Sequence, residues 1–172
     1  RATWDRDVAI LDVARTGSSL WLVGGGGLIL RSRDAGATWT DLSLGAYDQF
    51  LGIMNSVNGS VLYLSGSEGL VLKTTDGGES LAEVDGPWPR ETGYTARAAF
   101  LTERLGLVGV HFVSLDRDEA PRLWRTTDGG ASWSEATIRW EDSEYRRCHS
   151  IRWLDDQRVL IAMENGGALL LA

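Results

Sequence analysis

Short apolar runs, separated by clusters of glycine, aspartate and asparagine, follow one another along the whole chain. Runs such as "AILDVAR" (9–15), "SLWLVGG" (19–25) and "LILRS" (28–32) are rich in β-branched or aromatic residues. Their length and composition are typical of β-strands bounded by turns. We see no convincing apolar repeat of period 3.6, the period that an amphipathic helix requires. The pattern therefore predicts an all-β protein.

One phrase, an apolar strand that runs into a polar turn, occurs three times. It reads "LRSRDAGATW" at 30–39, "LKTTDGGESL" at 72–81 and "WRTTDGGASW" at 124–133. The aspartates that anchor the phrases are separated by 42 and then 52 residues. Self-similarity at this period is typical of propellers, in which each repeat is one four-stranded antiparallel blade.

Each repeat divides into an inner strand, a second strand that ends in glycine, a third that enters the aspartate turn, and an outer fourth. About four blade-equivalents result, within a single propeller domain or propeller segment, with approximate bounds 8–44, 45–85, 86–140 and 141–172. The last unit lacks a fourth strand, but "RATW" at 1–4 aligns with "GATW" at 36–39. Residues 1–7 are therefore expected to close the last blade. Four units can form a small ring, half of a ring that a second copy completes, or part of a longer propeller.

The repeated turn follows the order Ser/Thr, any residue, Asp, any residue, Gly, any residue, Ser/Thr, Trp. We expect the carboxylates to accept hydrogen bonds from nearby backbone amides, and the glycines to adopt the positive φ of a tight turn. The tryptophans should bury their rings and donate to a carbonyl; Leu81 replaces the second one. The residues of this structural pattern are Ser32, Asp34, Gly36, Trp39, Thr74, Asp76, Gly78, Thr126, Asp128, Gly130 and Trp133.

This pattern is that of the Asp-box, also called the BNR repeat. The stretches "LWLVGGGGLILRSRDAGATW" (20–39) and "LYLSGSEGLVLKTTDGGES" (62–80) most resemble the photosystem II assembly and stability factor propellers. The resemblance implies a non-enzymatic scaffold that binds proteins during assembly, in the periplasm, in a lumen or secreted. Asp-boxes also occur in sialidases, xyloglucan-cleaving glycosidases and sortilin-type receptors, so they indicate architecture better than activity.

Charge and composition limit the classes of partner that the chain can bind. Lys and Arg total 17 against 24 Asp and Glu, a formal net charge of −7, which disfavours nucleic acid. The longest uncharged apolar runs, such as residues 19–30, contain glycine and are shorter than a bilayer span, so no membrane insertion is expected. The single cysteine, Cys148, cannot form an internal disulfide.

The candidate binding surface is the propeller face opposite the aspartate turns. Three linkers on it are "AYDQF" (46–50), "GYTAR" (93–97) and "EYRRCH" (144–149). Guanidinium groups gathered near a central funnel would bind a protein or peptide partner that is acidic, and tyrosines would add rigid contact area. Alternatively, the tyrosines cap blade ends and the arginines pair with Asp48, Glu141, Asp142 or Glu144. The candidate partner-binding residues are Tyr47, Tyr94, Arg97, Tyr145, Arg146, Arg147 and His149.

Neither a metal nor a cofactor is expected. The loop at 111–122 carries Asp116, Asp118 and Glu119 but lacks the glycine and distant glutamate of a calcium-binding loop. His111 and His149 have no Cys or His companion at zinc spacing.

The alternative function is that of a carbohydrate-active glycoside hydrolase, sialidase-like or xyloglucanase-like, or a fragment of one. Such an enzyme needs two carboxyl groups at a defined separation. Asp48, Glu91, Asp142 and Glu144 are available, but none lies in a recognisable catalytic motif. We therefore expect no catalytic residues and no enzyme activity.

Overall fold

A computed structural model describes residues 7–45, 51–113, 120–136, 147–163 and 168–171. In these segments the chain is built almost entirely from antiparallel strands, with a single 3-10 turn, η1 (Gly25–Gly27), and no α-helix. The prediction of an all-β protein is confirmed. No helix in the described segments is long and apolar enough to span a bilayer.

The strands form four consecutive sheets, each with the strands paired in sequence order. Sheet 1 contains β1 (Ile10–Thr16), β2 (Ser19–Gly24), β3 (Ile29–Ser32) and β4 (Thr40–Asp41). Sheet 2 contains β5 (Leu51–Ser56), β6 (Leu62–Gly66), β7 (Val71–Thr74) and β8 (Ala82–Glu83). Sheet 3 contains β9 (Tyr94–Phe100), β10 (Gly106–Phe112), β11 (Arg122–Thr126) and β12 (Ser134–Ala136). Sheet 4 contains β13 (Cys148–Trp153), β14 (Val159–Met163) and β15 (Ala168–Leu171).

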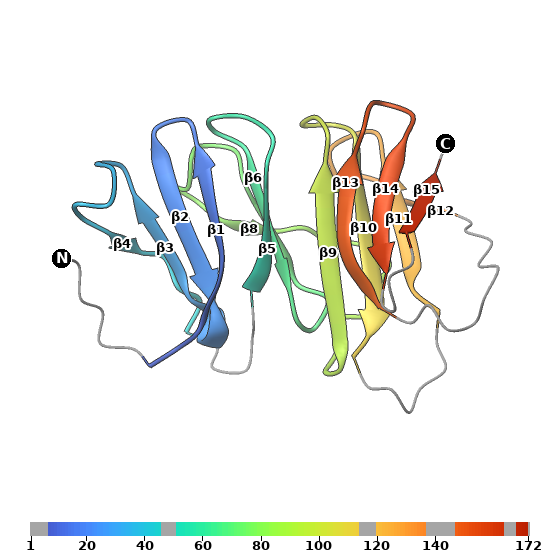
Figure 1. The fold of residues 1–172 in the computed structure, drawn as a ribbon, viewed down its shortest axis with the longest axis horizontal. Coiled ribbons are helices and arrows are strands. Elements are labelled where there is room, and N and C mark those ends of the chain that lie inside the picture. The colour runs from blue at the N-terminus through green and yellow to red at the C-terminus, as the bar shows by residue number, and fades with distance from the viewer. Residues whose placement is uncertain (1–6, 46–50, 114–119, 137–146, 164–167, 172) are drawn as a thin grey trace.

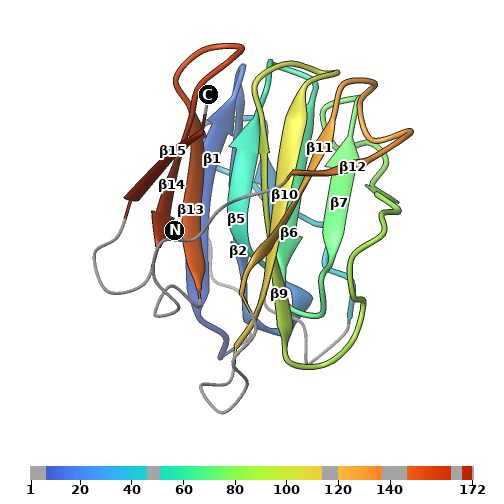
Figure 2. The same ribbon diagram turned by 90° about the vertical axis from the view of Figure 1, so that its right-hand side faces the viewer.

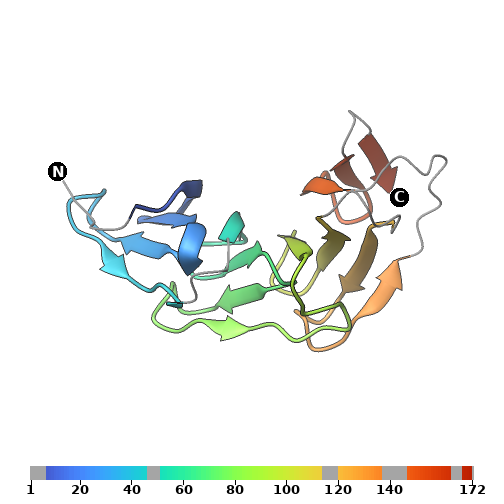
Figure 3. The same cartoon turned by 90° about the horizontal axis from the view of Figure 1, so that it is seen from below.

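The four sheets follow one another along an open arc, with sheets 1 and 4 at its two ends (Figures 1 and 3). The first strand of each sheet lies toward the inside of the arc and the last strand toward the outside (Figure 3). The expected role of residues 1–7 as an added strand of sheet 4 falls almost wholly on residues outside the described segments, and stays a prediction.

Three apolar clusters fill the spaces between successive sheets. Sheets 1 and 2 enclose a cluster that includes Trp21, Ile29 and Leu64. Sheets 2 and 3 enclose the largest cluster, in which the rings of Tyr63 and Phe100 stack with their centroids 3.6 Å apart. The third cluster joins sheets 3 and 4 and includes Cys148, Ile151 and Ile161. Burial of apolar surface between sheets is thus the main source of stability.

Burial along the strands reflects each sheet's place in the arc. In sheets 2 and 3, β6 is buried at every residue, and β9 and β10 at nearly every residue, because a neighbouring sheet covers each face. In sheet 1, β1 alternates between exposed and partly buried residues, and β14 of sheet 4 alternates similarly. In the two terminal sheets these strands therefore have one covered side and one more exposed side, whereas β3 of sheet 1 is buried at every residue.

Candidate functional site

The three aspartate turns share one hydrogen-bond pattern. In the second turn, Asp76 Oδ1 accepts hydrogen bonds from Thr74 Oγ1 at 2.8 Å and from Ser80 N at 3.0 Å, while Oδ2 accepts from Ser80 Oγ at 2.6 Å. The amide of Gly78 donates to Thr74 Oγ1 at 2.7 Å. The first and third turns repeat these bonds around Asp34 and Asp128.

Backbone conformation explains the glycine in each turn. Gly36, Gly78 and Gly130 have φ values of 92°, 87° and 96°, a region that residues with a Cβ rarely adopt. Each glycine lies two residues after its aspartate, where its N–H points back at the hydroxyl of the residue that ends the preceding strand. The sequence thus specifies the turn locally.

Local hydrogen bonds keep these carboxylates ionised. The hydroxyl and amide of Thr38 and the hydroxyl of Ser32 lower the pKa of Asp34 to about 2. The matching donors also lower the pKa values of Asp76 and Asp128. Such groups stay ionised at neutral pH, and their oxygens already accept hydrogen bonds within their own turns, so none is suited to act as a general acid.

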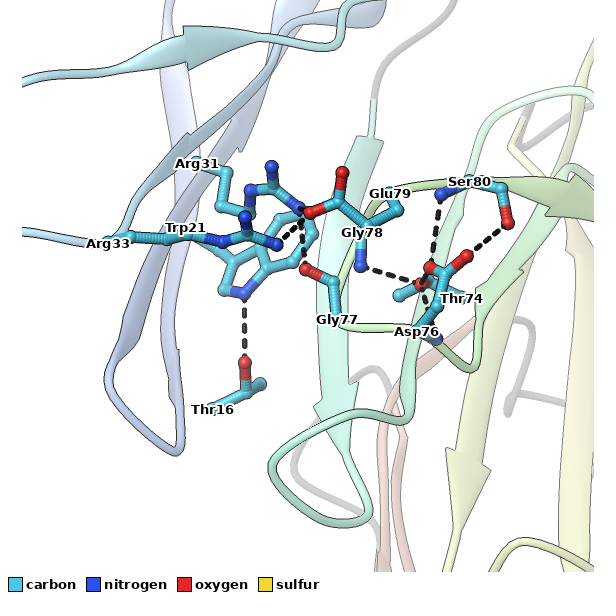
Figure 4. A network of polar contacts seen from close by, with 10 residues as sticks. All are labelled: Thr16, Trp21, Arg31, Arg33, Thr74, Asp76, Gly77, Gly78, Glu79 and Ser80. Atoms are coloured by element: carbon cyan, nitrogen blue, oxygen red, sulfur yellow. Dashed lines mark hydrogen bonds and ion pairs between the residues drawn. The ribbon is translucent and has the colours of Figure 1, made fainter.

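A cation from the preceding sheet holds the second turn in place (Figure 4). Arg31 Nη1 donates to Gly77 O at 2.7 Å and lies 3.5 Å from Glu79 Oε1, and Arg33 also pairs with Glu79. The buried ring of Trp21 packs so closely against Gly78 that a Cβ there would lie 2.1 Å from Trp21 Cη2.

The same contact recurs between sheets 2 and 3. Lys73 Nζ donates to Gly129 O at 3.3 Å and lies 5.3 Å from the centroid of the Tyr63 ring. In both cases the cation lies three residues before the aspartate of one turn. It donates to the backbone carbonyl of the residue directly after the aspartate of the next turn. Our sequence analysis missed this link, although the sequence signal was present in the cations at 31 and 73. It shows that the aspartate turns also join neighbouring sheets.

A cluster of arginine and histidine lies at the opposite end of sheet 3, between sheets 3 and 4; we call Arg97, His111, Arg147 and His149 the Arg/His cluster. The strand register places Thr95 opposite His111 and Arg97 opposite Gly109. Arg97 and His111 are therefore neighbours on the face of sheet 3 that looks toward β13. Arg147 Nη2 donates to Val113 O, just beyond the end of β10.

Burial and mutual repulsion shape the charges of the Arg/His cluster. Burial, together with the nearby Arg97, Arg147 and His149, lowers the pKa of His111 to about 3; His111 is therefore neutral at physiological pH. Burial also lowers the pKa of Arg97, with Cys148 acting in the opposite direction, but a guanidinium remains charged. The buried side-chain atoms without a hydrogen-bond partner in the described segments include Arg97 Nε and His111 Nδ1 in this cluster, and Arg31 Nε and Tyr63 Oη elsewhere.

The predicted partner-binding residues separate into three groups. Arg97 and Arg147 are partly buried and His149 is exposed, all within the Arg/His cluster. Tyr94 is only 8% exposed and packs edge-on against Phe112, so its ring belongs to the interior and offers little surface to a partner. Tyr47, Tyr145 and Arg146 lie outside the described residues, as do the acidic side chains Asp48, Glu141, Asp142 and Glu144 that were the alternative partners of the arginines.

Sequence reasoning did not connect His111 with the arginines. It considered His111 only as a possible zinc ligand, because the proximity of His111 to Arg97 depends on the register between β9 and β10. No group of three or more His, Cys, Asp or Glu side chains in the described segments is arranged to hold a metal ion. The chemistry that the Arg/His cluster can offer is hydrogen bonding to an anion.

Comparisons with known proteins identify the fold. No protein-family profile matches the chain, and no curated protein sequence matches it significantly. Among solved structures, YCF48 bound to D1 peptide is similar over 95% of this chain and 63% of that one, with 19% identity and a TM-score of 0.59. YCF48 from Cyanidioschyzon merolae matches 99% of this chain and 55% of that one, with 18% identity and a TM-score of 0.70. The chain thus spans less than two thirds of either YCF48 chain.

An enzyme of the same architecture is equally similar. The xyloglucanase of glycoside hydrolase family 74 from Xanthomonas campestris matches 89% of this chain and 25% of that one, with 16% identity and a TM-score of 0.68. At such identities the likeness concerns the fold alone. The four sheets are consecutive blades of a β-propeller, as the sequence predicted, and their number corresponds to part of a larger propeller.

Proposed function

We propose that this chain is a non-enzymatic scaffold that binds a protein or peptide partner, and that its repeated turns are Asp-boxes with a structural role. The proposal is supported by the shared turn geometry, by carboxylates held ionised within their own turns, and by similarity to YCF48, a propeller with a structure bound to D1 peptide. Like the assembly factors that its sequence resembles, it would act in the periplasm, in a lumen or as a secreted protein.

We place the partner site at the Arg/His cluster, opposite the Asp-boxes. The observation that carries this assignment is the burial of Arg97 Nε and His111 Nδ1 without hydrogen-bond partners in the described part of the chain. A buried unsatisfied polar group costs about 1–3 kcal/mol, and a ligand that accepts from it recovers that free energy. Carboxylates match the guanidinium geometry best, so an acidic peptide is the partner class that we propose.

Arginine substitution tests the site. We expect Arg147→Ala to weaken binding of a fluorescein-labelled peptide with three consecutive aspartates by about tenfold, the loss of one charge-assisted hydrogen bond. Arg104→Ala is the matched control, because it removes the same charge from an exposed position in the turn after β9, at the other end of the sheet. Fluorescence anisotropy measures both affinities.

Two results would contradict the proposed site. One is an equal loss of affinity in the Arg147 and Arg104 variants, which would indicate unspecific attraction. The other is unchanged binding of a peptide in which the three aspartates are replaced by asparagine, because the cluster would then not recognise the carboxylates.

The second candidate function, glycoside hydrolysis, is favoured only by similarity to the xyloglucanase fold. Of its four candidate carboxyl residues, only Glu91 lies in the described segments, and it is exposed. A screen with xyloglucan, β-glucans and chromogenic sialosides separates the two functions. We expect no turnover; robust turnover abolished by a single carboxylate substitution would establish the enzyme instead.

A further inference from the structure

The hairpins that join the first two strands of sheets 1, 2 and 3 meet at one end of the arc, where their turns lie side by side (Figures 1 and 2). A Cβ added to Gly17 in the first hairpin would lie 3.4 Å from Gly59 Cα in the second. Asn58, the residue before Gly59, donates from Nδ2 to Glu103 Oε1 of the third hairpin at 2.6 Å. The Asn58–Gly59 turn therefore contacts both neighbouring sheets.

The same turn supports an aspartate turn of its own sheet. Ser60 O accepts a hydrogen bond from Gly77 N at 2.9 Å. Gly77 O in turn accepts from Arg31 Nη1 of sheet 1. A change in the path of the chain at residues 58–60 would therefore reach the contact between sheets 1 and 2 as well as the contact with sheet 3.

Asparagine followed by glycine can lose its side-chain amide without an enzyme. Glycine has no Cβ to hinder the approach of its backbone nitrogen to the preceding side chain. Gly59 N would form a bond to Asn58 Cγ and lose its proton, while the bond from Cγ to Nδ2 breaks and ammonia leaves. Water then opens the resulting succinimide ring. Its attack at Cγ gives aspartate, and its attack at the backbone carbonyl carbon gives isoaspartate.

Three features of the turn favour this reaction. Asn58 and Gly59 are exposed, so water has access to both. Asn58 Oδ1 accepts hydrogen bonds from Ser60 N at 2.8 Å and from Val61 N at 2.9 Å. Donors at these distances stabilise the negative charge that develops on the oxygen when a nucleophile attacks its carbon. In the described segments no backbone carbonyl accepts from the Gly59 N–H, so its proton can pass to solvent.

We propose that Asn58 is a site of spontaneous deamidation, and that the product weakens the contact between the hairpins of sheets 2 and 3. The aspartate has no N–H to donate, so it would place a second carboxylate beside Glu103, where Asn58 now donates a hydrogen bond. Like charges at such a distance repel each other. Isoaspartate also adds a methylene group to the main chain and would displace Ser60 O from Gly77 N. This proposal does not depend on the proposed partner site.

Peptide mass spectrometry tests the site in the folded chain, kept at body temperature in mildly alkaline buffer. Trypsin cleaves after Arg33 and Lys73 and releases a peptide that contains both Asn55 and Asn58. We expect the mass gain of an exchange of NH2 for OH at Asn58. Asn55 is an internal control, because it lies in β5 and pairs with Tyr63, which holds its backbone extended.

Gly59→Ala is the matched variant. A Cβ at this position would have no neighbour closer than Gly17 Cα at 3.7 Å, and the φ of Gly59 lies outside the left-handed region, so the fold accepts alanine. We expect the variant to deamidate at Asn58 about tenfold more slowly, because the Cβ hinders the approach of the nitrogen. Equal rates in the two proteins overturn the proposed site. So does a folded chain that gains no mass at Asn58, or that gains it first at Asn55.

A second measurement tests the consequence. Asn58→Asp reproduces the aspartate product, and a further Glu103→Gln supplies an amide that donates to the new carboxylate. We expect Asn58→Asp to melt about 2–4 °C below the double variant, the shift that one such interaction produces in a chain of this size. Sodium chloride at about 1 M should narrow this gap, because salt screens exposed charges. Equal melting temperatures would show that the two carboxylates do not oppose each other, and would overturn the proposed weakening of the contact.

Discussion

Close approach between sheets 1 and 2 makes Gly78 a sensitive position. Replacing it with alanine puts a methyl group 2.1 Å from Trp21 Cη2, 2.8 Å from Trp21 Cζ2 and 3.0 Å from Arg31 Nη1. The indole is buried and donates to Thr16 Oγ1 at 2.9 Å (Figure 4), so it cannot move aside without losing that bond. The sheets must separate locally to accept the change.

Two contributions set the expected loss of stability. The φ of 87° at Gly78 disfavours a residue with a Cβ by about 1–2 kcal/mol. Forcing extra volume into a packed interface adds about 1–3 kcal/mol. Together they predict that Gly78→Ala lowers the free energy of unfolding by about 2–5 kcal/mol, a large part of the stability of a typical domain.

The chain offers matched controls at the equivalent glycines. Gly36 has φ 92°, but the nearest atom to its added methyl group would be Trp39 Cζ2 at 3.7 Å, an ordinary contact. Gly36→Ala should therefore cost only the backbone contribution, about 1–2 kcal/mol. Gly130 is intermediate, with Val84 Cγ1 at 3.2 Å. The expected order of destabilisation is Gly78, then Gly130, then Gly36.

Urea unfolding followed by circular dichroism measures all three variants. Equal losses at Gly36 and Gly78, with unchanged dependence on urea concentration, would refute the argument. Backbone conformation alone would then explain the glycines, and the approach of Trp21 would carry no energetic weight.

Three further predictions concern single groups. The pKa of Asp34 is lowered in the fold to about 2, against about 4 in an unfolded chain. Its stabilising contribution is therefore present above pH 4 and lost as the pH falls toward 2. Asp34→Asn should remove this pH dependence from the free energy of unfolding measured with urea between pH 4 and pH 2. Burial raises the pKa of the Cys148 thiol to about 12, so a thiol-specific chromogenic disulfide should react slowly with native protein and at once after unfolding; fast native reaction would contradict the burial. The pKa of His111 is lowered to about 3, whereas the unfolded chain takes up that proton near pH 6.5. The free energy of unfolding should therefore fall as the pH drops from 6.5 toward 3. His111→Gln should remove that decline; the same pH profile in the variant and the unmodified chain would indicate that the histidine is exposed to water.

Local sequence determined much of this fold. The strand expected at 19–25 is found at Ser19–Gly24, because its β-branched and aromatic run ends at glycine. The fourth strands are short: of the residues "TWTDLS" at 38–43, only Thr40–Asp41 forms a strand. Residues 38 and 39 belong instead to the aspartate turn, where Thr38 donates to Asp34. Side-chain bonding in the turn overrides strand propensity there.

The proposed binding site was less accessible to sequence reasoning. Its arginines were predicted from their place in the linkers, but the proximity of His111 to them depends on strand register, which no local signal specifies. Tyr94 looked like a surface tyrosine because it follows a glycine in a linker. Pairing of β9 with β10 instead places it against Phe112, inside the interface between sheets 2 and 3.

The two ends of the propeller segment differ in how their charges are used. At the Asp-box end, described carboxylates and cations meet one another: Asp76 is bonded within its turn, and Arg31 reaches a carbonyl of the next sheet. At the other end, Arg97 retains a buried N–H without a partner in the described segments. A polar group that folding leaves unsatisfied destabilises the free protein, and that cost is recovered only when a ligand accepts the bond. Binding at the Arg/His cluster should therefore raise the melting temperature of the chain.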